Sequence, residues 1–237
     1  MKNLAVAVLF IGASVTSSIL AIIPSNADAA PGDFTWSQSP TNLSGDSMAW
    51  HAVATSSDAT KLAAVVENGY VYTSADSGAS WTERTAAGYR LWGGISGSSD
   101  GSRLAAVSRN GSSGAVYTST DSGASWTERT LPGAAPYIHV SADGMHIVTM
   151  SDQVGGAVYV SDDFGVTWST ASTLPGSNQW RGLVASADNT KLLAIPFGTD
   201  YLYTSADSGE TWVQQTDSGS RSWYRAASSA DGTKLVA

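Results

Sequence analysis

The feature that most constrains the fold is a ten-residue segment that occurs four times with nearly constant spacing. Successive copies end on tryptophans that lie 45, 42 and 44 residues apart. Self-similarity at a period of this size indicates a series of equivalent structural units. Each copy contains the pattern Ser-x-Asp-x-Gly-x-[Ser/Thr]-Trp, called a box below. The fixed positions are Ser74, Asp76, Gly78 and Trp81; Ser119, Asp121, Gly123 and Trp126; Ser161, Asp163, Gly165 and Trp168; and Ser205, Asp207, Gly209 and Trp212.

A second element precedes each box: a Ser-x-Asp turn between two short apolar runs, as at Ser56 to Asp58 and Ser98 to Asp100. One unit therefore contains four predicted strands, at about 51–55, 61–66, 69–74 and 80–84 in the first. Four-stranded units at this period are typical of propeller blades. We expect an all-β fold, a β-propeller of four-stranded antiparallel blades, with at least five blades implied. The units span about 50–84, 92–129, 135–171, 180–215 and, incomplete, 223–237.

The box resembles the Asp-box, or bacterial neuraminidase repeat, and all four copies match every fixed position of that pattern. The resemblance covers nearly all of the chain after residue 29 and implies a sialidase-like propeller fold. In such a hairpin the Asp carboxylate accepts hydrogen bonds from turn amides, the Gly tolerates a positive φ, and the Trp buries a large ring. The four Asp residues lie in different blades, which disfavours a shared metal or catalytic role.

The two ends of the chain carry separate predictions. Lys2, the apolar run from Leu4 to Ile23 and the small-residue site at 27–29 predict a signal peptide at 1–29. An uncleaved anchor is the alternative. The propeller would then occupy 30–237, secreted or periplasmic, with no membrane span after cleavage. Residues 33–38 align with the end of a box and should close the last blade, whereas the fifth unit stops in its second strand, which suggests a C-terminally truncated sequence.

No coherent catalytic set emerges from the residues. Asp-boxes occur in sialidases, xyloglucan-cleaving glycosidases, sorting receptors, fucose-binding lectins and photosystem assembly factors, so the resemblance predicts fold better than function. The early Phe/Tyr-Arg-Ile-Pro motif of sialidases is absent. Arg90, Arg181 and Arg225 lie near the starts of innermost strands, where a degenerate arginine site would have to be. Most aspartates occupy repeated turn positions, so a two-carboxylate glycosidase site is not indicated.

Cofactors and polyanionic partners are also disfavoured. The three histidines lack metal-ligand spacing, the chain has no cysteine, and no phosphate-binding loop is present. We therefore expect no metal and no cofactor. A net charge of −8 disfavours binding to nucleic acid.

A further repeated position carries tryptophan at the start of four of the five innermost strands. These rings could pack as a core element, or form an aromatic rim that stacks on sugars or partner side chains. The neighbouring residues vary, as they would around a binding site. Loops at 108–114 and 151–156 should lie at the same end and could add contacts. The predicted ligand-binding residues are Trp50, His51, Trp92, Tyr137, Trp180, Arg181, Trp223, Tyr224 and Arg225.

The sequence thus favours an exported, non-catalytic recognition or scaffolding propeller that binds glycans or an extracellular protein. One alternative is a glycoside hydrolase, exo-sialidase-like or xyloglucanase-like, whose catalytic residues lie partly in further C-terminal repeats. A periplasmic or lumenal assembly factor is the third.

Overall fold

The computed structural model describes residues 8–10, 19–22, 36–38, 48–109, 114–176 and 179–237. These residues are almost entirely β-structure, with two short 3-10 helices, η1 (Thr85–Ala87) and η2 (Thr216–Ser218). Much of the predicted signal peptide at 1–29 and of the predicted closing strand at 33–38 lies outside the described residues. None of the described helices is long and apolar enough to cross a bilayer.

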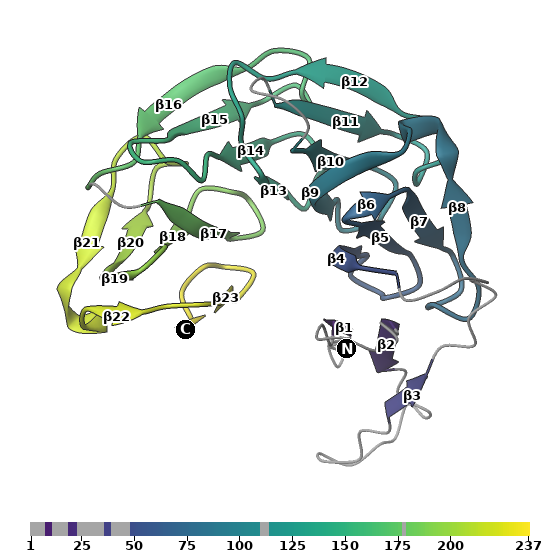
Figure 1. Cartoon of the computed structure of the whole chain (residues 1–237), viewed down its shortest axis with the longest axis horizontal. Coiled ribbons are helices and arrows are strands. Elements are labelled where there is room, and N and C mark those ends of the chain that lie inside the picture. Colours follow the sequence, from purple (N-terminus) through teal and green to yellow (C-terminus); the bar gives the residue numbers. More distant parts are fainter. Residues whose placement is uncertain (1–7, 11–18, 23–35, 39–47, 110–113, 177–178) are drawn as a thin grey trace.

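Four antiparallel sheets follow one another along the chain and are arranged as the blades of a β-propeller, which confirms the predicted fold class (Figure 1). Blade I contains β4 (Trp50–Thr55), β5 (Leu62–Val66), β7 (Val71–Ser74) and β8 (Thr82–Arg84). Blade II contains β9 (Arg90–Gly97), β10 (Leu104–Ser108), β11 (Ala115–Ser119) and β12 (Thr127–Thr130), with the short β6 (Asn68–Gly69) paired to β9. Blade III contains β13 (Tyr137–Val140), β14 (Ile147–Met150), β15 (Ala157–Ser161) and β16 (Ser169–Thr173). Blade IV contains β17 (Trp180–Ala185), β18 (Leu192–Pro196), β20 (Leu202–Ser205) and β21 (Val213–Gln215).

Several shorter strands lie outside the four blades. β19 (Thr199–Asp200), in the connection between β18 and β20, pairs with β22 (Arg221–Ser222), and after blade IV β23 (Ala227–Ser228) pairs with β24 (Leu235–Val236). At the other end, β1 (Val8–Phe10), β2 (Ile19–Ile22) and β3 (Trp36–Gln38) form a small sheet. In this structure β3 pairs with β2, so closure of a last blade by residues 33–38 stays a prediction, as does any blade beyond four.

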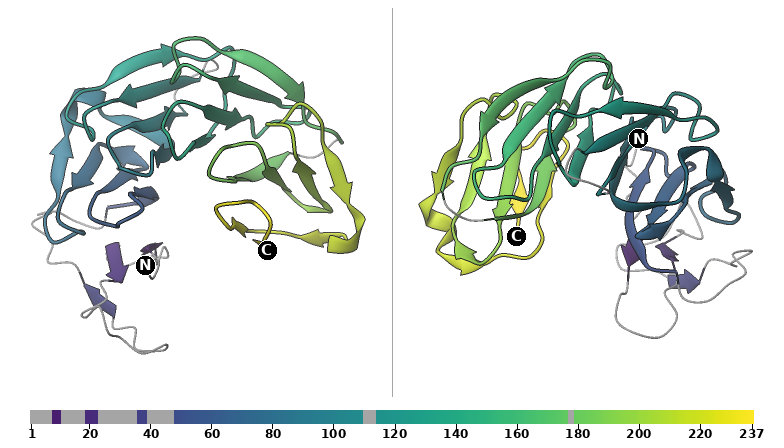
Figure 2. Two further views of the ribbon diagram at one scale, coloured as in Figure 1. Left: turned by 180° about the vertical axis from the view of Figure 1, so that it is seen from behind. Right: turned by 45° about the horizontal axis from the view of Figure 1, so that its top comes forward.

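The blades form an arc in which strands β4, β9, β13 and β17 lie on the inside and β8, β12, β16 and β21 on the outside (Figures 1 and 2). The second strand of each blade, such as β5 or β10, is buried along its whole length. Side chains alternate across a strand, so each second strand contributes to two inter-blade cores. Ala105 and Val107 pack toward blade III, whereas Leu104 and Ala106 pack toward blade I.

Neighbouring blades are joined by a chain of backbone hydrogen bonds between their Ser-x-Asp turns. The amide of Ser57 donates to the carbonyl of Ser99 at 2.7 Å, and the amide of Ser99 donates to Ala142 at 2.8 Å. The series continues from Ala142 to Ala187 at 2.6 Å and from Ala187 to Ala230 at 2.7 Å. The backbone amide of each turn thus finds its hydrogen-bond acceptor in the turn of the next blade. These bonds set the spacing between blades.

Each box folds into the same hydrogen-bonded clip. In blade II the Ser119 hydroxyl donates to Asp121 Oδ1 at 2.7 Å and accepts the Gly123 amide at 2.8 Å. The Asp121 carboxylate also accepts the Ser125 amide and hydroxyl, at 2.8 and 2.6 Å. Gly123 has φ of +87°, a conformation that glycine adopts without strain, and its carbonyl accepts the Trp126 indole N–H at 2.9 Å. The box is therefore a structural element, as its chemistry predicted.

Removal of the central hydroxyl tests this clip. Ser119 is almost fully buried, so Ser119→Ala leaves the amide of Gly123 without its acceptor. We expect a loss of about 1–3 kcal/mol in the free energy of unfolding, measured by urea denaturation. The neighbouring exposed Thr120 is the control, because Thr120→Ala should change stability by less than about 0.5 kcal/mol. Equal effects of the two substitutions would contradict the clip.

The same clips predict an acid-sensitive stability. Hydrogen bonds from serine and threonine hydroxyls, then from turn amides, lower the pKa of the turn aspartates to about 2, as at Asp121 and Asp188. Because the folded pKa lies below the usual 3.8, this stabilisation is complete above about pH 4 and is lost as the pH falls toward 2. The thermal midpoint should therefore drop between pH 4 and 2. Asp121→Asn should reduce that drop, whereas Asp217→Asn, at an exposed aspartate outside these turns, should leave it unchanged.

Candidate functional site

The four repeated inner tryptophans are packing residues. Trp92 and Trp180 are 0% and 2% exposed, and each ring meets the tyrosine of its own blade edge to face, Tyr117 and Tyr203, both at 5.4 Å between centroids. Trp50 meets Tyr72 in the same way at 5.2 Å. The prediction that Trp92 and Trp180 contact a ligand is thus wrong, because their rings are enclosed between strands. The structure supports the alternative, a core element that recurs in blades I, II and IV; blade III has Ala135 at this position.

The residue that follows each inner tryptophan has a different environment. In the first, second and fourth blades the inner strand contains a β-bulge at this residue, so His51, Gly93 and Arg181 have no opposite partner in the neighbouring strand. A bulge bends the strand and re-aims a side chain. These three residues line a single concavity on the inside of the arc.

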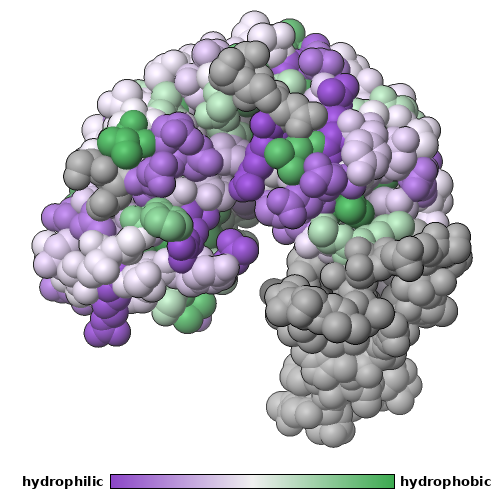
Figure 3. Space-filling view, viewed as in Figure 1, coloured by the Kyte–Doolittle hydropathy of each residue, from purple (hydrophilic) through white to green (hydrophobic). Residues whose placement is uncertain are grey.

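That central concavity has a volume of about 500 Å³. All four inner strands contribute to it, together with the segment between β22 and β23. The lining includes the apolar side chains of Val53, Ile95, Ile138 and Leu183, which are called the floor below. Figure 3 shows hydrophilic residues along the inner margin of the arc. The polar and aromatic side chains that line it are His51, Arg109, Tyr137, Arg181, Tyr224 and Arg225.

Two of the three arginines of the concavity, Arg181 and Arg225, contact aromatic rings. The Arg181 guanidinium carbon lies 4.4 Å from the Phe197 ring centre and 4.6 Å from that of Tyr224. The Arg225 guanidinium lies 5.3 Å from the same Tyr224 ring. Such cation–π contacts position a guanidinium while leaving its N–H groups at the ring edge free to donate.

Arg109 reaches the concavity because Gly93 has no side chain. The Arg109 amide donates to the Leu91 carbonyl at 2.8 Å, which fixes the start of the loop after β10. A Cβ atom on Gly93 would lie 3.0 Å from both Cγ and Nε of Arg109 and 3.1 Å from the Pro136 carbonyl oxygen. Glycine at the bulge of β9 therefore makes room for the Arg109 side chain against the inner strand.

Two titratable groups respond to this concentration of positive charge. Burial lowers the pKa of His51 below its usual 6.5, and Arg109 and Arg225 lower it further, while Glu67 and a hydrogen bond with the Gly93 backbone act in the opposite direction. Burial raises the pKa of Tyr137, whose hydroxyl donates to the Trp180 carbonyl at 3.1 Å. All three arginines of the concavity oppose that rise, whereas the charge of Asp152 adds to it, so side chains of both charge signs act on Tyr137.

The predicted binding residues fall into two groups. The concavity brings together His51, Tyr137, Arg181, Tyr224 and Arg225, all of them predicted. Trp50, Trp92, Trp180 and Trp223 do not line it. Arg109 does line it and was not among the predicted residues, although its loop was expected to add contacts. Arg90 lies elsewhere: its guanidinium stacks 4.3 Å from the Tyr117 ring and lies 3.9 Å from Glu128 on the outer strand.

The described lining contains donors and cations but no carboxylate. The described residues also contain no group of three or more His, Cys, Asp or Glu side chains that could hold a metal ion. Arginine N–H groups, the His51 ring and the tyrosine hydroxyls can bind and orient an acceptor group. The arrangement is suited to recognition of an anionic or hydrogen-bond-accepting ligand.

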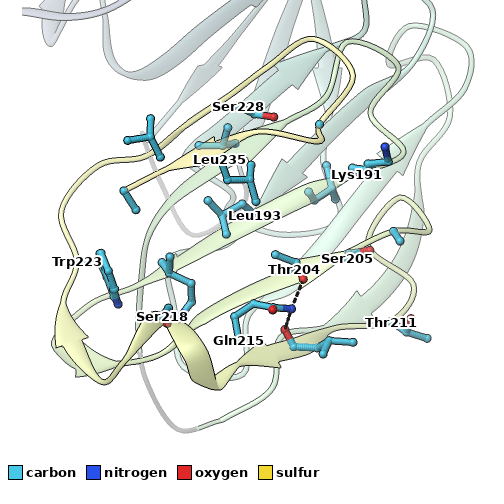
Figure 4. A pocket seen from close by; sticks show the side chains of 18 residues that line it. Lys191, Leu193, Thr204, Ser205, Thr211, Gln215, Ser218, Trp223, Ser228 and Leu235 are labelled. Carbon is cyan, nitrogen blue, oxygen red and sulfur yellow. Dashed lines mark hydrogen bonds between the residues drawn. The ribbon is translucent and has the colours of Figure 1, made fainter.

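A larger groove of about 660 Å³ lies on the far side of blade IV from blade III, and Figure 4 shows its lining. Leu193 and Ile195 of β18 belong to this side, with Trp223 packed against them, whereas Leu192 and Ala194 face blade III. Its position corresponds to the inter-blade cores between the other blades. We interpret it as a packing face of the propeller and not as a ligand site.

The electrostatic arrangement of the concavity predicts a measurable response of His51. Its pKa, followed by NMR titration, should lie below 6.5 and should rise in Arg109→Gln and in Arg225→Gln, because each change removes a nearby positive charge. Arg129→Gln is the control, since Arg129 lies on the outer strand β12. An unchanged His51 pKa in both concavity variants would show that the arginines do not converge there.

Comparisons with known proteins agree on the fold. No protein-family model matches the chain, and no curated protein matches it in sequence. Solved structures do match. The chain superposes on Kuenenia stuttgartiensis hydrazine synthase with a TM-score of 0.67 at 14% identity, covering 92% of this chain and 66% of that one.

Two further structures illustrate the range of these matches. A GH74 xyloglucanase from Xanthomonas campestris gives a TM-score of 0.58 at 18% identity, covering 70% of this chain and 30% of that one. YCF48 from Cyanidioschyzon merolae gives a TM-score of 0.60 at 16% identity, covering 80% of this chain and 61% of that one. The chain thus spans about a third of the xyloglucanase and three fifths of YCF48. At these identities the likeness concerns the fold alone. The chain is a β-propeller, a fold that some of these neighbours use in enzymes and others in non-catalytic proteins.

Proposed function

We propose that this protein is an exported, non-catalytic recognition propeller that binds a partner protein at the face around the central concavity. The observation that carries the proposal is the convergence of arginines and tyrosines on a concavity whose described lining has no carboxylate. A glycoside hydrolase of the two-carboxylate type needs an acid and a base or nucleophile in its site. Binding is the activity that the residues present support best.

The surface around the concavity has the composition of a protein interface. Two large aromatic side chains there are more than half exposed: Tyr224, which lines the concavity, and Phe197, whose ring contacts Arg181. They precede an inner strand or follow a second strand, positions that the up-and-down topology of a blade places at one end of the propeller. Tyrosine and arginine are over-represented among the residues that dominate binding energy, and aromatic residues are enriched in interfaces generally.

The titles of two structural neighbours support a protein partner, although GH74 enzymes are also among the neighbours. One is titled YCF48 bound to a D1 peptide, with a TM-score of 0.60 at 18% identity, covering 89% of this chain and 64% of that one. Another is titled a nidogen/laminin complex, with a TM-score of 0.64 at 12% identity, covering 98% of this chain and 84% of that one. Both titles describe a complex that contains a propeller like this one. Our proposal is that this chain also uses its propeller to bind another protein.

A binding screen with substituted aromatic residues tests the proposal. Arrays of extracellular proteins and of glycans would be probed for saturable binding. Tyr224→Ala should weaken binding to a protein partner about tenfold or more, because it removes an exposed ring and the support of two arginines. Val213→Ala is the control, since Val213 is equally exposed but lies on the outer strand β21.

Two results would contradict the proposal. One is saturable turnover of a fluorogenic sialoside or of xyloglucan by the purified protein. The other is protein binding that is unchanged in Tyr224→Ala and in Phe197→Ala but reduced in Val213→Ala.

A further inference from the structure

The central concavity concentrates positive charge in an acidic protein. The chain has a net charge of −8, yet its three inward arginines come from distant parts of the sequence. Arg109 follows β10 of blade II, Arg181 belongs to β17 of blade IV, and Arg225 lies between β22 and β23. The fold therefore assembles a cationic site that the overall composition does not show.

The ion pairs identified among the described residues do not involve these three arginines. They join Arg90 to Glu128, and His146 to Asp143 and Asp162. Arg181 and Arg225 instead contact aromatic faces, and Arg109 lies along the glycine of β9. Three arginines outnumber the two carboxylates whose charge reaches the site, Glu67 beside His51 and Asp152 beside Tyr137, so an anion in the concavity would gain a net attraction.

The remaining lining limits the kind of anion. The floor is apolar, the rim is aromatic, and a volume of about 500 Å³ is in the range of sites that bury a small organic ligand. A simple inorganic ion would leave the apolar floor and the Tyr224 ring without contacts. A short extended peptide can place carboxylates against the arginines and its backbone or apolar groups against the floor. Arginine binds carboxylates with paired, charge-assisted hydrogen bonds.

We propose that the central concavity binds an acidic peptide segment of the partner, with Arg109, Arg181 and Arg225 as its carboxylate-binding residues. This inference rests on the proposed function and names the chemistry of the partner. The carboxylates come from acidic side chains or from a chain terminus. Tyr224 and Phe197 hold Arg181 in place and are positioning residues for it.

Three fluorescent peptides test the inference with purified protein: hexaglutamate with a free C-terminus, hexaglutamate with an amidated C-terminus, and hexaglutamine with a free C-terminus. Both glutamate peptides should bind if the arginines contact side-chain carboxylates. Binding of the free forms alone would assign the site to a terminal carboxylate, and either pattern supports the proposal. Affinity should fall as salt is added, because the contacts are electrostatic.

Each of Arg109→Gln, Arg181→Gln and Arg225→Gln should weaken binding of the favoured peptide about tenfold or more, since each removes a charged hydrogen-bond donor. Arg129→Gln on the outer strand should stay within about twofold of the parent protein. Near-UV circular dichroism would check that every variant is folded. In the parent protein, bound peptide should also raise the pKa of His51, because its carboxylates offset the charges of Arg109 and Arg225, while Glu67 is present in both states.

Failure of hexaglutamate with a free C-terminus to bind, or no effect of the three arginine changes, would overturn the inference. So would binding of an oligogalacturonate without binding of any peptide. Failure here is distinguishable from failure of the proposed function. If a protein partner found by the array still depends on Tyr224 while acidic peptides do not bind, the partner-binding face stands and only the acidic-peptide assignment falls.

Discussion

The position of every blade depends on one backbone hydrogen bond, from its Ser-x-Asp turn to the same turn of the next blade. Four such bonds run in series from Ser57 to Ala230. Each aspartate closes its own turn by accepting hydrogen bonds from a serine two residues before it, as Asp58 does from Ser56. Because the closed turn presents its amide and carbonyl in a fixed direction, successive blades acquire the same spacing. The inner strands are therefore placed by a set of contacts at the opposite end from the concavity.

That separation explains how one chain combines a strict repeat with a variable site. Tryptophan and tyrosine pairs, such as Trp92 with Tyr117, hold the inner strands of blades I, II and IV against their own blades. The bulge that follows the tryptophan turns the next side chain toward the centre, where His51, Gly93 and Arg181 differ from blade to blade. Changes at those positions leave the inter-blade cores intact. The repeated residues maintain the fold, and the residues beside them determine the chemistry of the concavity.

The sequence was sufficient to predict the four blades and the hydrogen-bonded boxes, because both depend on local patterns of serine, aspartate, glycine and tryptophan. It left the role of the inner tryptophans open, since a ring at a strand start can face the core or the rim. Arg90 was a candidate for a degenerate arginine site at the centre, but it lies two residues before Trp92 and so shares its side of the strand, where both contact Tyr117. Arg109 was missed because its place depends on a glycine in the adjacent strand, which only the folded backbone reveals.

The central claim is that Arg109 and Arg225, far apart in the sequence, meet across the concavity. The chain contains no cysteine, so two introduced cysteines can be spin-labelled without background. Labels at positions 109 and 225 should give a shorter distance distribution, by electron paramagnetic resonance, than labels at 84 and 213 on the outer strands β8 and β21. An equal or longer distance for the 109 and 225 pair would contradict the account.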